Sequence, residues 1–153
     1  MFFSTVITMT GTRHAHKLTT QQKHNFAIYL KILLHHGYTH LQHGDALGAD
    51  AFAHQEATML GFQVIIHPPT DPKFRAFCQS DEIRVPNAYK IRNQNMVDSC
   101  SLVLALPDGN ERLRSGTWMT VRMARTEHLP IVIFYPDGQV VFETNNQSIP
   151  SFD

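Results

Sequence analysis

The sequence predicts a single α/β domain of the Rossmann-like type, with about five strands in a mainly parallel sheet and helices on both faces. Short apolar runs alternate along the chain with segments whose apolar residues recur at helical spacing. Most of the runs are continuously apolar, which is typical of parallel strands that are buried on both faces. At 153 residues the chain is long enough to bury one core without further support.

The elements follow from local signals taken in chain order. Strands are expected at residues 6–10, 39–43, 62–67, 101–107 and 131–135. Helices are expected at residues 18–37, 48–60, 87–99 and 117–127. Thr19 or Thr20 can cap the first helix, and Gly37 and Gly61 can end the first and second. Residues 70–86 are polar and contain prolines, so we expect a loop with at most a short helix.

The chain is expected to divide into one α/β domain, residues 1–138, and an edge strand with a polar tail, residues 139–153. The opening stretch, MFFSTVITMTGT, lacks a basic segment and predicts a first strand rather than a signal peptide. No apolar run reaches the length of a membrane span. Cys78 and Cys100 show no metal or redox spacing. These features predict a cytoplasmic protein with free thiols and no membrane partner.

The charge balance argues against nucleic acid as the partner. Lys and Arg number 13, as do Asp and Glu, so the formal net charge is zero. Binding to a phosphate backbone needs clustered cations. The sequence therefore places single-stranded DNA binding last among the functions considered.

Four histidines gather at the end of the first helix, His35, His36, His40 and His43. A zinc site needs ligands that converge on one point, and these lie across a helix end, a turn and a strand. His35 and His36 are expected instead near free carbonyl groups of the helix C-terminus. The sequence thus predicts no metal and no resident cofactor.

Unusual residues follow several of the predicted strands, and all fall on one edge of the sheet. Gly11, Thr12 and Arg13 follow the first strand, residues 44–50 the second, and residues 107–117 the fourth. Parallel strands end at a common edge, where ligands of open α/β sheets bind. This coincidence predicts a binding site.

The stretch HGDALGAD places two glycines and two aspartates where the second strand becomes a helix. Gly44 and Gly48 can adopt positive φ and bring backbone N–H groups close to an anion at the helix N-terminus. Asp45 or Asp50 can cap the helix. Alternatively, either carboxylate can accept hydrogen bonds from ribose hydroxyls or from an arginine. The pattern alone does not separate these roles.

The stretch RSGTW supplies a second candidate for anion binding. Ser115, Gly116 and Thr117 precede a predicted helix, so hydroxyls and N-terminal amides can donate together to a phosphate. Arg112 and Arg114 add positive charge just upstream. The alternative is an ordinary Ser or Thr helix cap.

The ordered motifs GTR, HGDALGAD, IRNQNM and SGT resemble the SLOG superfamily, in particular its small YspA-like branch. The superfamily includes the Lonely guy-type phosphoribohydrolases and the DNA-processing protein A fold. The resemblance covers roughly residues 6–135. It implies a Rossmann-like nucleotide site and a homo-oligomer, with site residues Gly11, Arg13, Gly44, Asp45, Gly48, Asp50, Arg92, Asn93, Ser115, Gly116 and Thr117.

The chain departs from the phosphoribohydrolase pattern at two places. Trp118, Met119 and Thr120 stand where that family carries a glutamate, and Asp108-Gly109 replaces its double glycine. These departures count against N-glycosidic cleavage by the family mechanism. The sequence therefore predicts binding of a nucleotide or nucleotide-derived molecule, such as an ADP-ribose-like signal. The alternative is a nucleotide N-glycosidic hydrolase, with Arg92, Asp45 and Asp50 as its candidate catalytic residues.

Overall fold

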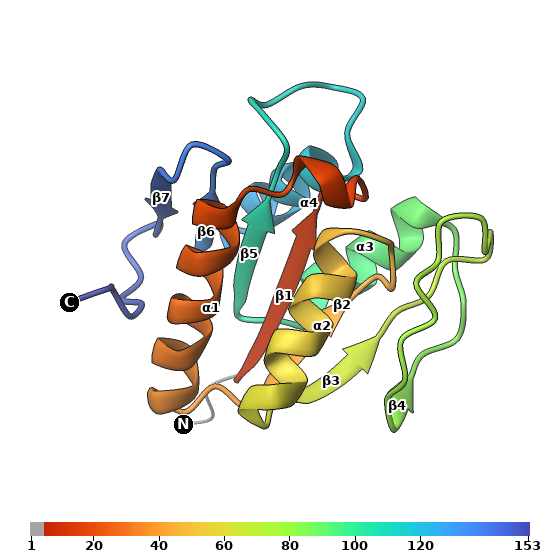
Figure 1. Cartoon of the computed structure of the whole chain (residues 1–153), viewed down its shortest axis with the longest axis horizontal. Coiled ribbons are helices and arrows are strands. Elements are labelled where there is room, and N and C mark those ends of the chain that lie inside the picture. Colours follow the sequence, from red (N-terminus) through yellow and green to blue (C-terminus); the bar gives the residue numbers. More distant parts are fainter. Residues whose placement is uncertain (1–4) are drawn as a thin grey trace.

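The computed structural model describes residues 5–153 and contains one seven-stranded sheet (Figure 1). The strand order is β4-β3-β2-β1-β5-β6-β7. All pairings are parallel except that of β6 with β7. The first four residues of the predicted N-terminal stretch lie outside the described residues. The strands are β1 (Val6–Gly11), β2 (His40–His43), β3 (Gln63–Ile66), β4 (Glu82–Ile83), β5 (Leu102–Leu106), β6 (Ile131–Phe134) and β7 (Val140–Glu143).

Helices cover both faces of the sheet, as the sequence predicts. They are α1 (Thr20–His35), α2 (Ala49–Leu60), α3 (Tyr89–Asp98) and α4 (Gly116–Thr126), with a short 3-10 helix at Ala15–Lys17. Helices α1 and α2 pack on one face around Phe26, Leu30 and Ala53. Helix α4 packs on the other face through Trp118 and Val121. Figure 1 shows α1 and α2 in front of the sheet and α3 and α4 behind it.

The first helix begins and ends at residues that the sequence identifies. Thr19 is the N-cap and forms a reciprocal capping box with Gln22, which satisfies two backbone donors. Gly37 follows the helix with φ of 94°, a backbone conformation that glycine adopts without strain. The Gln22 side chain also donates to the carbonyl oxygens of Pro107 and Phe134, each at 2.7 Å. It thereby fixes α1 against the carboxyl ends of β5 and β6.

The segment between β3 and α3 is the predicted loop and contains no helix, but it includes a short strand that the sequence did not predict. Its one regular element is the two-residue strand β4, which pairs with Ile65 and Ile66 of β3. Side chains from other elements contact the rest of this segment. Such long-range contacts leave no periodic pattern in the sequence. Strand β7 lies where an edge strand was expected within residues 139–153, so β4 is the strand that the sequence did not predict in the seven-stranded sheet.

The C-terminal tail has no regular structure beyond β7, yet it packs on α1. The Tyr29 hydroxyl donates to the Pro150 carbonyl oxygen at 2.6 Å. The ring of Phe152 lies 5.3 Å from that of Tyr29, measured between centroids. No helix within residues 5–153 combines the length and the apolar character that a membrane span requires.

Candidate functional site

A cavity of about 430 Å³ lies at the carboxyl ends of the strands, where the strand order reverses. The chain runs outward from β1 through β2 to β3, and later returns to the other side of β1 as β5. Open α/β sheets bind ligands at such a switch point. Asp45 and Gly48 do not line the cavity. The other predicted site residues do: Gly11, Thr12, Arg13, Gly44, Asp50, Arg92, Asn93, Ser115, Gly116 and Thr117.

The N-terminus of α4 forms one end of the cavity. Ser115 is the N-cap, and its hydroxyl accepts a hydrogen bond from the Trp118 amide at 3.3 Å, so the expected capping role is present. Thr117 is 7% exposed, and its hydroxyl has no hydrogen-bond partner among the described residues. The first amides of a helix also lack intrahelical acceptors and carry partial positive charge. This end can therefore donate several hydrogen bonds to an anion.

Thr10 is a cavity residue that the sequence prediction missed. Along β1 the side chains alternate between the faces, so Ile7 and Met9 enter the core cluster beneath α1 and α2. Thr8 and Thr10 lie on the opposite face, and Thr8 donates to the Met96 carbonyl oxygen of α3 at 2.9 Å. Thr10 is 8% exposed, lines the cavity and has no partner within the described part of the chain. The alternation Ile-Thr-Met-Thr was the signal that could have identified it.

Arg92 is buried and fastens the turn after β2 to α3. Its Nη1 donates to the carbonyl oxygens of Gly44, at 2.5 Å, and His67, at 3.2 Å. Its Nε donates to Asn93 Oδ1 at 2.7 Å. The remaining nitrogen, Nη2, has no acceptor among residues 5–153. Burial lowers the pKa of the guanidinium, and the carboxylate of Asp50 opposes that shift. Arg92 thus stabilises the turn after β2, and its Nη2 can still donate to a ligand.

Asp50 does not cap α2, contrary to one of the two roles expected for it. The cap position is Gly48, which makes no side-chain cap. Asp50 lies in the first turn, where its Oδ2 accepts from the amides of Gly44 and Ala46 at 3.1 and 3.0 Å. Burial raises the pKa of this carboxyl to about 6, although Arg92 and the two amides oppose the rise. The other oxygen, Oδ1, has no hydrogen-bond partner in the described chain.

Asp45 points away from the cavity and holds the segment that follows β3. Its backbone has a positive φ of 57°. Its fully buried carboxylate accepts from Arg75 Nε at 2.5 Å and from the Cys78 amide at 2.9 Å. The two aspartates of the turn thus lie on different sides of it. The structure gives Asp45 an anchoring role in place of the ligand contact that the sequence suggests.

Gly48 approaches protein backbone closely rather than lining the cavity. Its φ is 83°, and a Cβ at this position would lie 2.5 Å from the carbonyl oxygen of Thr12. The Thr12 carbonyl also accepts from the Ala49 amide at 2.9 Å. Glycine is therefore required where the turn after β2 crosses the turn after β1.

Of the four histidines between residues 35 and 43, His43 lies in a cluster with residues from elsewhere in the chain. Ligand atoms of His43, His54 and Cys78 all lie within 4.8 Å of one another. The Asp45 amide donates to His43 Nδ1 at 2.9 Å, so the His43 proton belongs on Nε2, which lies 2.9 Å from His54 Nδ1. Burial and His54 lower the pKa of His43 to about 3. The contact is a hydrogen bond between two neutral imidazoles, and a cation at Nε2 would have to displace this proton.

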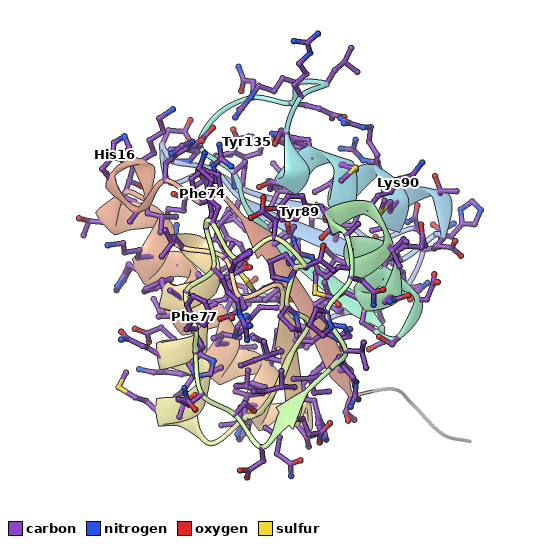
Figure 2. All side chains as sticks on the ribbon, turned by 90° about the vertical axis from the view of Figure 1, so that its right-hand side faces the viewer. His16, Phe74, Phe77, Tyr89, Lys90 and Tyr135 are labelled. Atoms are coloured by element: carbon purple, nitrogen blue, oxygen red, sulfur yellow. The ribbon has the colours of Figure 1, made fainter. Side chains whose placement is uncertain are left out.

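Two aromatic side chains of the segment after β3 line the cavity, and sequence reasoning missed both. Phe74 packs beneath Arg13, whose Cζ lies 3.9 Å from the ring centroid. Tyr89, at the start of α3, lies 5.5 Å from the Cζ of Arg92. In Figure 2 Phe74 and Tyr89 lie in the upper part of the molecule, and Phe77 lies lower. No periodicity surrounds Phe74 or Tyr89, so the sequence held no signal for them.

The loop after β5 brings further charge to the cavity mouth. Asp108 accepts from the Thr12 hydroxyl at 2.8 Å and pairs with Arg112 at 2.9 Å. Glu111 pairs with Arg122 and Arg125 of α4, at 3.3 and 2.9 Å. Arg112 and Arg114 line the cavity next to the N-terminus of α4. Hydrogen bonds and ion pairs therefore attach the loop at both ends, and its arginines lie at the end of the cavity formed by the N-terminus of α4.

Comparisons with known proteins add information on the fold. No protein-family model matches the chain, and neither does any curated protein sequence. The molybdenum cofactor binding protein of the phototrophic bacterium Rippkaea orientalis has a TM-score of 0.65, at 21% identity over 87% of this chain and 77% of that one. DNA processing protein A of Streptococcus pneumoniae has a TM-score of 0.62, at 18% identity over 84% of this chain and 49% of that one.

The molybdenum cofactor carrier protein of Chlamydomonas reinhardtii is also similar. It has a TM-score of 0.58, at 21% identity over 84% of this chain and 74% of the carrier. At these identities the likeness concerns the fold, and it agrees with the fold that the motifs predict. The chain therefore shares the Rossmann-like fold of these proteins.

Proposed function

We propose that this protein binds a nucleotide or a nucleotide-derived small molecule, with a phosphate at the N-terminus of α4. One observation carries the proposal. The cavity at the switch point joins that helix N-terminus to Thr10 and Thr117, two residues that are more than nine-tenths buried and whose hydroxyls have no partner within residues 5–153. Both hydroxyls can therefore donate to a ligand that enters the cavity. A bound phosphate would accept from both.

The charges around the cavity support an anionic ligand. Four arginines line it, Arg13, Arg92, Arg112 and Arg114, against the two carboxylates of Asp50 and Asp108. The whole chain has a formal net charge of zero, so this excess of positive charge is local. Arginine is well suited to phosphate because its planar guanidinium donates two parallel hydrogen bonds.

The remaining walls support a heterocyclic ring. Phe74 and Tyr89 present aromatic surface, and Pro69 and Met96 present apolar surface. Aromatic side chains stack on bases without depending on sequence or hydrogen bonding, because every base has a π face. Two of the similar structures are described as binding or carrying the molybdenum cofactor, so binding of a small molecule is consistent with the fold.

We propose a carrier or sensor in the cytoplasm rather than an enzyme as the leading interpretation of this phosphate-binding cavity.

A second candidate is N-glycosidic hydrolysis, and Asp50 is the observation in its favour. Its carboxyl lines the cavity, and a pKa near 6 suits general acid or base catalysis. Homo-oligomerisation is a further part of the proposal, with exposed Ile83, Val85 and Ile91 along β4 and the start of α3 as the candidate surface.

The test is isothermal titration calorimetry with adenosine monophosphate, guanosine monophosphate and ADP-ribose, accompanied by mass spectrometry of small molecules released on heating. Thr117→Val removes the unpartnered hydroxyl while keeping the side-chain shape. We expect the variant to bind about tenfold more weakly, the scale of one hydrogen bond to a charged group.

Thr126→Val is the matched control, since Thr126 lies exposed at the other end of α4 and donates to the Arg122 carbonyl. Failure of all three nucleotides to bind the wild-type protein, with no nucleotide released on heating, would contradict the proposal. Chromatography of the same mixtures detects any free base, and multiple turnovers would favour the hydrolase.

A further inference from the structure

The two oxygens of the Asp50 carboxylate have different roles, one in the fold and one at the cavity. Oδ2 is fully used, because it accepts from the two amides of Gly44 and Ala46. Oδ1 has no hydrogen-bond partner among the described residues, and no described cation forms an ion pair with Asp50. The residue is 6% exposed, and it lines the cavity. An acceptor oxygen of a residue that is mostly buried thus lies at the wall of the cavity without a donor from the protein, so a ligand in the cavity can donate to it.

The sheet determines which part of a ligand can reach Asp50. Asp50 lies in the helix that follows β2, and the anion-binding residues lie in the helix that follows β5, with β1 between the two strands. Neighbouring strands are spaced about 4.8 Å apart, so the two ends of the cavity are separated by roughly 10 Å. In a nucleoside monophosphate the sugar hydroxyls lie near the phosphate, and the edge of the base lies farther away. A ligand whose phosphate is at α4 would therefore present its base edge to Asp50.

We infer that Asp50 selects ligands whose heterocycle presents adjacent N–H donors, as the 2-amino-4-oxo-pyrimidine edge of guanine or a pterin does, over the edge of adenine. The inference rests on the proposed function, because it takes the phosphate to lie at α4. It replaces the ribose hydroxyls, which the sequence suggested as partners of Asp50, with the heterocycle.

The selection follows from the donors and acceptors on each side. An ionised carboxylate oxygen can only accept hydrogen bonds. The guanine and pterin edges offer a ring N–H beside an amino group, so both neighbours donate. The adenine edge offers one amino group beside a ring nitrogen whose lone pair repels the carboxylate. Discrimination is large in a buried site, because a mismatched ligand leaves polar groups unpaired.

Asp50→Asn changes the recognising atom in a defined way. The amide oxygen must stay with the Gly44 and Ala46 amides, since an NH₂ group there would face two other donors. The amide NH₂ then takes the place of Oδ1, so an acceptor becomes a donor. Size and shape are retained. The variant should therefore lose its preference for guanine and gain affinity for the acceptor nitrogen of adenine.

The experiment measures affinities of the full chain for guanosine, inosine and adenosine monophosphate and for neopterin monophosphate by calorimetry at pH 7.5. We expect the wild type to bind the guanine and pterin ligands about tenfold to a hundredfold more tightly than adenosine monophosphate. Inosine monophosphate, which lacks the amino group, should lie between them. Asp50→Asn should abolish or reverse the ratio, and the control Asp98→Asn, at an exposed position outside the cavity, should keep it.

A pH titration of the wild type tests the same point without a variant. The preference for guanine over adenine should shrink between pH 7.5 and pH 5, because the pKa of Asp50 lies near 6 and the protonated acid becomes a donor. Arg92 of α3 and Asp45 of the same turn are the charged groups that face it. The two nucleotides share the same phosphate, so its own titration cancels in the ratio.

The outcomes separate the inference from the proposed function. Equal affinities for the guanine and adenine ligands, unchanged in Asp50→Asn but weakened together by Thr117→Val, would overturn the inference and leave the proposed function in place. Failure of every ligand to bind the folded wild type would overturn both. Tight binding of neopterin monophosphate without guanosine monophosphate would support the edge recognition and identify a pterin as its source.

Discussion

The guanidinium of Arg92 occupies the space that a side chain on Gly44 would need. A Cβ built on Gly44 would overlap the guanidinium, whose Nη1 donates to the Gly44 carbonyl oxygen at 2.5 Å. Position 44 is therefore glycine because another part of the protein, rather than a ligand, approaches its backbone. The relation ties the turn after β2 to α3 beside the cavity.

Gly44→Ala should destabilise the fold by displacing Arg92. We expect a loss of about 1–3 kcal/mol, the range for overpacking a close-packed site. Urea unfolding followed by fluorescence of the buried Trp118 measures it. Gly109→Ala is the control, since a Cβ there would meet nothing within 4 Å, and a change within about 0.5 kcal/mol is expected. Equal stability of the two variants would show that Arg92 moves freely.

Arg92→Met should destabilise the protein more than a surface arginine variant does. The carbonyl oxygens of Gly44 and His67 would lose their donor, and each buried acceptor left unpaired costs about 1–3 kcal/mol. We expect about 2–4 kcal/mol less free energy of unfolding in urea titrations. Arg84→Met, at an exposed ion pair with Glu82, should change it little. The Arg92 variant should also raise the pKa of Asp50 further, because Arg92 lowers it.

Phe74 and Phe77 form a matched pair for testing ring stacking. Each lies under an arginine, Arg13 over Phe74 at 3.9 Å and Arg75 over Phe77 at 4.7 Å. Phe74 lines the cavity, and Phe77 does not. Phe74→Ala should weaken binding of guanosine monophosphate by about 1–3 kcal/mol, the scale of stacking on one base. Calorimetry should give unchanged affinity for Phe77→Ala, and equal losses would remove Phe74 from the ligand site.

Stability should fall as the pH decreases from about 6 to 4.5. Burial lowers the pKa of His43 to about 3 and of His67 to about 4, so unfolding lets both bind protons below 6.5. Asp50 acts oppositely, because its raised pKa near 6 makes the folded state bind a proton first. These three groups together differ by about one proton, which gives about 1.4 kcal/mol per pH unit, and the lowered pKa of His54 acts in the same direction as those of His43 and His67.

Asp50→Asn removes the opposing contribution and so provides the control for that slope. In this variant the slope between about pH 4.5 and 6 should be steeper than in the wild type by about 1.4 kcal/mol per pH unit. Free energies of unfolding from urea titrations at three pH values measure both slopes. A variant slope equal to or shallower than that of the wild type would show that Asp50 titrates with an ordinary pKa.

The fold was predictable where local signals determine it. Capping by Thr19, the positive φ of Gly37 and the apolar periodicity of the helices all depend on residues close in the sequence. Strand β4 was not predictable, because Glu82 and Ile83 form it only by pairing with β3, far from any periodic pattern. The tail likewise packs on α1 through Pro150 and Phe152, which contact Tyr29 although they lie far from it in the sequence.

The site was predictable in its location but not in how its residues divide their roles. The rule that parallel strands end at a common edge brought together Arg13, Asp50 and Thr117. The separate positions of Asp45 and Asp50 depend on the positive φ of Asp45, which turns its carboxylate toward Arg75. Sequence alone gives no dihedral angle for an aspartate, so equal roles were assigned to both.

The anchoring of the 70–88 segment by Asp45 has a consequence for how ligand specificity could evolve. In the turn after β2, a backbone amide donates to Asp50. The carboxylate of Asp45 in the same turn accepts from the segment that carries Phe74. A substitution in this turn would alter recognition and folding together, so few such changes would survive selection. The loop after β5 is attached mainly by exposed ion pairs such as Glu111 with Arg122, which contribute little to stability. New specificities should therefore arise first at the phosphate end, and a mutational library for changed ligand preference belongs in residues 108–114.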